Sequence, residues 1–300
     1  MTTPRSAFPS IERVVVDPTQ IAAFTNEEDF MELAFNLLRE VTSYTGLAAG
    51  TLGPKPAWTR DQAAVGGNMV RLSKLLSAFL DQTQQRRPET STILSRLTFE
   101  TIVNVRYLIA NFGPELAADY RRYSLRHERR LWDVIQANIK ARAGVVLPIE
   151  DRMMKSIDRA ARFSGFEIES IDLKAKGPWG GKDLRQKAEA VGLDGLHYLA
   201  AFGGMSHNVH GAWFDLQQYH LKEAGEDAFT PKLEWGRPRP QPLFALGTLS
   251  LDAVADFFNF IGGDETLAHM QDKLDDLMGR LHRASEAHEA YLVGKTWPEI

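Results

Sequence analysis

Two pairs of polar residues have the types and the spacing that acid–base chemistry needs. Arg96 and Glu100 are four residues apart, and so are Ser206 and His210. Residues four apart share one face of a helix. A histidine can take up or release a proton near neutral pH, and an arginine can hold an anionic group. The pairs therefore form a candidate catalytic site, with His210 as acid or base and Ser206 or Arg96 as its partner.

Each pair also lies on an apolar stripe of its expected helix, where a charge must be paired to be tolerated. We therefore expect the two helices to pack together, with Arg96, Glu100, Ser206 and His210 in one contact cluster. Such a cluster can equally be a buried network that fixes helix register, and we favour this structural interpretation. The apolar neighbours are Ile93, Val103 and Tyr107 on the first helix and Phe202, Val209 and Trp213 on the second.

A glycine-rich stretch, GPWGGKD, superficially resembles a phosphate-binding loop. Only three residues separate Gly177 from Gly181, where that loop needs four, and Asp183 replaces the magnesium-binding hydroxyl. No strand is expected before it. We interpret the stretch as a loop that leads into a helix.

The histidines do not have the spacing of a metal site. In helical bundles a glutamate typically stands three residues before a metal-binding histidine, and none does so at His197, His207, His210 or His220. The chain has no cysteine, which excludes disulfides, thiolate metal sites and cysteine nucleophiles. We expect no metal and no cofactor.

Apolar residues recur at helical spacing along most of the chain, and only residues 14–16 have the character of a strand. The sequence predicts an all-α fold, an irregular multi-helix bundle of about eight or nine helices. One helical domain is expected over 26–292, with a loosely attached extended segment at 1–25 and a tail at 293–300. The expected helices begin after the capping sequence NEED and then cover about 59–84, 90–111, 115–143, 148–165, 182–190, 194–223, 244–260 and 265–292.

Net charge and the placement of charged residues limit the classes of partner that we expect. The formal net charge of −4 gives no global attraction to nucleic acid, so the basic helix at 115–143 is the expected polyanion surface. The apolar stretch 243–261 carries Asp252 and Asp256, which favours a buried helix over a membrane span. No secretory signal is recognised at the N-terminus. We expect a cytoplasmic protein with no membrane contact, whose partner is another protein, a second copy of itself, or RNA.

Three segments carry a resemblance to a known family: SRLTFETIVNVRYLI, YRRYSLRHERRLW and YLAAFGGMSHNVHGAW. Over about 62–221 the chain resembles a bacterial family of uncharacterised helical proteins, classed as a domain of unknown function. That family pairs an Arg-x-x-x-Glu helix with a later Ser-x-x-x-His-Gly helix. The resemblance implies that Arg96, Glu100, Ser206 and His210 are the characteristic positions, and it implies no established activity.

A more distant similarity is to the HEPN helical ribonucleases, whose signature is an arginine followed by a histidine five to seven residues later. The pairs Arg122–His127 and Arg283–His288 have this spacing, whereas residues 203–205 before His210 are Gly, Gly and Met. Two functions therefore stay open. One is a non-catalytic interaction or regulatory protein. The other is a metal-independent hydrolase, most plausibly a HEPN-like ribonuclease that uses His210. Solvent access to His210 distinguishes them.

Overall fold

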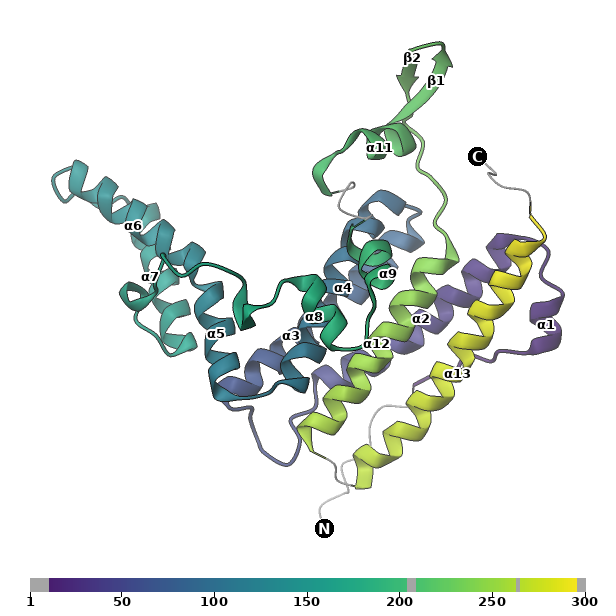
Figure 1. The fold of residues 1–300 in the computed structure, drawn as a ribbon, viewed down its shortest axis with the longest axis horizontal. Helices are drawn as coiled ribbons and strands as arrows, with labels where there is room; N and C mark the ends of the chain where they lie inside the picture. Colours follow the sequence, from purple (N-terminus) through teal and green to yellow (C-terminus); the bar gives the residue numbers. More distant parts are fainter. Residues whose placement is uncertain (1–10, 204–208, 263–264, 296–300) are drawn as a thin grey trace.

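A computed structural model describes residues 11–203, 209–262 and 265–295. Helices dominate it (Figure 1), which confirms the predicted irregular all-α architecture. The longer helices are α2 Glu27–Ala49, α3 Arg60–Gln84, α4 Pro88–Ala110, α5 Pro114–Ser124, α6 Arg126–Ala141, α7 Pro148–Ser164, α12 Pro240–Ile261 and α13 Glu265–Val293. The shorter elements are α1 Pro18–Ala22, η1 Ile168–Ser170, η2 Trp179–Gly181, α8 Leu184–Ala190, α9 Gly195–Tyr198, η3 Leu199–Gly203, α11 Trp213–Asp215, η4 Leu216–His220, β1 Leu221–Gly225 and β2 Ala228–Pro231.

The ends of the longer helices follow local sequence signals. The Asn26 side chain accepts a hydrogen bond from the Asp29 amide at the start of α2, 3.1 Å away, as the NEED sequence predicts. Thr59 and Gln62 form a reciprocal capping box on α3. Proline occupies the first turn of α4, α5, α7 and α12. Gly165 ends α7 in the left-handed conformation, with φ +80°.

Five helices form the body of the protein. α2, α3, α4, α12 and α13 enclose one core, with α12 running across it (Figure 1). α12 is long and apolar enough to cross a membrane, but 61% of its apolar window is buried inside the fold, as in a core helix. Its two aspartates have a partner in Arg106 of α4, which donates to Asp252 at 3.2 Å and to Asp256 at 2.8 Å. The expected buried helix is therefore what the structure contains.

The described part of the N-terminal segment, residues 11–25, is bound to the body, and for this part our prediction of a loose attachment is wrong. Arg280 of α13, whose side chain is 2% exposed, donates to both carboxylate oxygens of Glu40 on α2 at 2.6 Å. The same two residues bind the Val14 backbone, because Glu40 accepts from its amide and Arg280 donates to its carbonyl, each at 2.8 Å. Arg13 pairs with Asp276, which also accepts from Arg280. This buried network holds residues 13–14 against two helices.

A helical arm, made of α6 and α7 with α5 at its base, extends away from the body (Figure 1). The expected single helix at 115–143 is interrupted at Leu125, where α5 ends and α6 begins. No glycine or proline marks this break, and Leu125 is buried in a separate small core. The members of that core are Leu125, Ile135, Ile157, Ala161, Ile168 and Ile171.

A second protrusion, residues 209–235, is called the projecting segment below. It contains α11, η4 and the antiparallel pair β1–β2 (Figure 1). The predicted continuous helix at 194–223 is therefore wrong, and so is the expectation of no strand. Gly211 adopts φ +59°, which breaks the helical path. Asp227 and Gly225, at φ +54° and +133°, close the turn between the strands.

Candidate functional site

A polar stripe runs along one face of α4. Thr92, Arg96 and Glu100 follow one another at intervals of four residues, and Tyr107 lies two turns further on. This face is covered by α8 and η3, which pack on α4. The stripe thus connects the body to α8 and η3, the two elements that precede the projecting segment along the chain.

Arg96 is held by an aromatic ring. Its guanidinium carbon lies 4.1 Å from the centre of the Phe202 ring in η3, a cation–π contact. The Arg96 Nε is buried without a hydrogen-bond partner. Among the described residues Arg96 makes no ion pair with Glu100, although both side chains lie on the same face. Arg96 therefore helps to seat η3 on α4 through its planar face.

Glu100 faces a lysine that the sequence did not single out. Lys187 of α8 is only 3% exposed, and its Nζ lies 3.5 Å from the centre of the Trp179 ring. Burial lowers the pKa of Lys187 to about 8, while the carboxylates of Asp119, Asp183 and Glu100 act in the opposite direction. A lone lysine in a short charged helix looks like a solvated residue, so no sequence pattern identified it.

The glycine-rich stretch positions this aromatic contact. Trp179 packs edge-on against Tyr107 and Tyr120, with ring centres 5.6 and 5.0 Å away. The next residue, Gly180, is at φ +67° and donates its amide to Asp119 at 2.7 Å. A side chain at Gly180 would meet Leu116 at 3.0 Å. Asp183 caps α8 by accepting from the Gln186 amide at 2.8 Å. The stretch is therefore a loop leading into a helix, as predicted.

The four predicted site residues are not all brought together by the described structure. Ser206 lies outside the described residues, as does His207. His210 is exposed, so our expectation that it is buried is wrong. Among the described residues His210 makes no hydrogen bond or ion pair with Arg96 or Glu100. Its place in a common cluster stays a prediction.

The other histidines have local roles. The His197 amide and ring both bond to Asp194, the ring nitrogen Nδ1 at 2.7 Å. His288 of the Arg283–His288 pair is 1% exposed and packs against Phe30, and burial lowers its pKa. No group of three or more His, Asp or Glu residues that could hold a metal occurs within the described part of the chain.

The projecting segment is anchored at the N-terminal end of α4. Burial raises the pKa of Tyr219, whose hydroxyl faces Thr92. Arg87 stacks over Trp235 at 5.7 Å, and a side chain at Gly236 would meet Pro88 at 3.2 Å. These contacts hold the base of the segment against the helix, and its outer part projects away from the body (Figure 1).

The outer part carries an aromatic surface, defined here as Trp213, Phe214, Phe229 and Leu233. Their exposures are 57%, 60%, 42% and 88%. The rings of Trp213 and Phe229 meet edge-on at 5.6 Å. Both strands of the hairpin are exposed, apart from Leu221 at the start of β1, which is partly buried. This surface was missed because Val209 and Trp213 were assigned to an apolar stripe of a long packed helix.

Comparison with curated proteins and with solved structures finds no match. One family model matches residues 62–228, more than half of the chain; its description is "Family of unknown function (DUF5677)". The matched region contains Arg96, Glu100 and Lys187 and most of the projecting segment. The chain therefore belongs to this family of unknown function.

Proposed function

We propose that this protein is a non-catalytic interaction protein that self-associates through its aromatic surface. The observation that carries the proposal is the exposure of Trp213, Phe214, Phe229 and Leu233 on a segment that stands clear of the body. Aromatic side chains are enriched where proteins bind proteins. At about 150–250 Å² for each aromatic side chain, these exposures leave several hundred Å² uncovered. Patches of that size on a monomer usually mark an interaction site.

A second copy of the chain is the occupant that the projecting segment suits best. A two-stranded hairpin is marginally stable alone in water, and the contacts described for β1–β2 are with α11 and η4 of its own segment. Its polar residues carry both signs of charge, with Lys222 paired to Glu234 at 2.9 Å. A surface of mixed charge around an apolar centre can complement itself across a two-fold axis.

The α4 stripe supports this function indirectly. Arg96 and Glu100, which the sequence made candidates either for catalysis or for the structural network that we favoured, contact or face the segment that leads to the aromatic surface. Lys187, the lysine with the lowered pKa, is covered by Trp179 and is 3% exposed. These residues are therefore proposed to position the projecting segment. His210 is exposed, as the hydrolase alternative requires, but no contact within the described residues places an arginine beside it, so its exposure does not carry that alternative.

Sedimentation equilibrium tests the proposal. The wild-type chain should pass from monomer to dimer between about 1 and 100 μM, the range of weak to moderate self-association. Trp213→Asp should weaken the dimer at least about 30-fold, because a central aromatic residue contributes about 2 kcal/mol or more to an interface.

The matched control is Ile149→Asp at the tip of the arm, because Ile149 is also 57% exposed. This variant should associate like the wild type. A wild-type chain that is monomeric throughout the range, or an equal effect of both substitutions, would contradict the proposal.

A further inference from the structure

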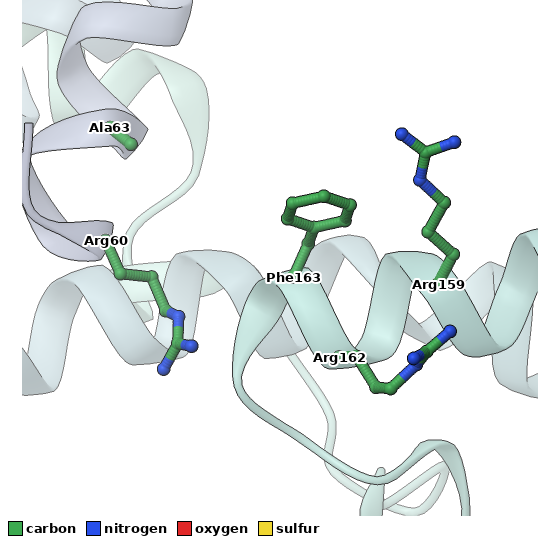
Figure 2. A pocket seen from close by; sticks show the side chains of 5 residues that line it. All are labelled: Arg60, Ala63, Arg159, Arg162 and Phe163. Carbon is green, nitrogen blue, oxygen red and sulfur yellow. The ribbon is translucent and has the colours of Figure 1, made fainter. Parts of the chain in front are cut away.

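An arginine-lined groove lies where the base of the arm meets the body. Arg60 and Ala63 come from the start of α3, and Arg159, Arg162 and Phe163 come from the end of α7 (Figure 2). The groove encloses about 610 Å³ and is open to solvent. The proposed self-association does not involve it.

Gly165 allows the end of α7 to approach Arg60 at the start of α3 closely. A side chain at this position would lie 2.5 Å from Nη1 of Arg60, and the backbone has φ +80°. The Arg60 guanidinium therefore packs against the backbone just after α7. Arg121 of α5 links the two ends, since it donates to Asp61 at 2.6 Å and to the Ser164 carbonyl at 3.2 Å.

Phe163 is an exposed ring among cations. It is 69% exposed, and the Arg159 guanidinium lies 5.3 Å from its centre. Figure 2 shows the ring between Arg60 and Arg159, with the three guanidinium groups pointing in different directions. Groups that do not converge suit a series of anions better than one small anion. A single ring beside them suits a planar group that stacks.

The cations of the groove are weakly neutralised. Within the described residues Arg60 and Arg159 have no ion pair, and Arg162 pairs with Asp158 at 3.0 Å in an exposed geometry that contributes little. Between residues 114 and 164 the chain carries eleven Lys or Arg and seven Asp or Glu residues, whereas its total net charge is −4. The positive charge is thus concentrated in the arm and its base.

We propose that this groove binds single-stranded nucleic acid. A base stacks on Phe163, while Arg60, Arg159 and Arg162 contact successive phosphates. Aromatic rings in a basic groove bind single strands in this way, and the stacking tolerates any base. A membrane surface fits less well, because it requires a broad apolar face rather than one ring flanked by arginines.

Fluorescence anisotropy with a labelled oligouridylate of about 12 nucleotides tests the proposal at low salt, since one site covers about 4–16 nucleotides. Phe163→Leu should weaken binding by about 5- to 160-fold, because stacking contributes about 1–3 kcal/mol per base. The double variant Arg60→Gln, Arg159→Gln should reduce the slope of log affinity against log salt by about 1.4, or about 0.7 per lost phosphate contact.

Two matched controls keep the test specific. Phe112→Leu removes a 42% exposed ring at the end of α4, and Arg185→Gln removes an exposed arginine of α8; neither lines the groove, and both should bind like the wild type. Circular dichroism should show all variants folded. The proposal is overturned by absence of binding, by groove variants that bind as the wild type does, by equal competition from a duplex, or by binding to phosphatidylserine vesicles alone.

Discussion

The five-helix body and the projecting segment differ in how much they bury their large apolar side chains. Among the body-helix residues whose side chains are described, one large apolar side chain is exposed: that of Val293, the last residue of α13. The projecting segment has 27 residues and exposes seven such side chains. The body helices therefore bury their own apolar side chains, whereas the projecting segment has apolar surface that is exposed among the described residues. We infer that substitutions in the body change unfolding and that substitutions in the segment change association.

Two arginines, one in the body and one next to the chain that leads to the projecting segment, also differ in how they are held. Arg280 in the body bonds to both oxygens of Glu40, to the Val14 carbonyl and to Asp276. Arg96, beneath the chain that leads to the projecting segment, stacks on Phe202 with a buried Nε that lacks a hydrogen bond. A fully bonded buried arginine fixes a fold. An arginine held by its face leaves its partner segment more freedom to move.

The largest effect is expected in the body. Glu40→Ala removes the buried carboxylate that pairs with both Nη atoms of Arg280 and accepts from the Val14 amide, so the free energy of unfolding should fall by about 3–5 kcal/mol. Urea unfolding monitored by circular dichroism measures it. Glu28→Ala is the control, because it removes an exposed pair with Arg86 and should cost less than about 1 kcal/mol. Similar losses in both variants would show that the network is not a main source of stability.

A smaller effect is expected at Lys187, and it depends on pH. Its folded pKa of about 8 lies below the ordinary value of 10.5, so between these values the unfolded chain holds more protons. Stability should therefore rise with pH in this interval, by about 1.4 kcal/mol for each unit of pKa difference. Lys187→Met should lose this rise, as measured by urea unfolding at pH 8 and pH 10. Tyr44 and Tyr219 are present in both proteins and do not affect the comparison. A slope shared by wild type and variant would exclude Lys187 as its source.

The smallest effect on stability is expected at Arg96. Arg96→Met removes a cation–π contact of about 0.5–2 kcal/mol, but it also removes a buried Nε without a partner and keeps the apolar stem. The net loss should be below about 1 kcal/mol in thermal unfolding. Hydrogen exchange should become faster in η3, which loses its contact with α4. If Arg96→Met destabilises the chain as much as Glu40→Ala does, the two arginines have the same role and the comparison fails.

The rule that a charge on an apolar stripe needs partners was sound, but the sequence could not show where those partners lie. The rule holds for Arg280 with Glu40 and for Arg106 with the aspartates of α12. These contacts join residues 240 and about 150 positions apart, and spacing along one helix carries no information about them. We also applied the rule to Arg96. The partner that the structure describes for Arg96 is the aromatic ring of Phe202 rather than a charged group.

The helices were predictable where a cap, a proline or a glycine marks their ends, as at Asn26, Pro148 and Gly165. They were not predictable at Leu125, where burial in a separate core ends α5 without any such residue. The stretch from 194 to 223 has helical periodicity over most of its length. Its fold is decided instead by Gly211 and by the turn at Gly225 and Asp227, which allow the chain to leave α4 and form the hairpin.

The most direct test of self-association uses the absence of cysteine in this chain. A single Glu223→Cys on exposed β1 places one thiol beside the aromatic surface, and a single Ser156→Cys places one on the exposed side of α7 in the arm. A short bismaleimide should link two copies through residue 223 and not through residue 156, and Trp213→Asp should abolish the linkage at 223. Absence of linkage at 223, or equal linkage at both positions, would contradict self-association through the aromatic surface.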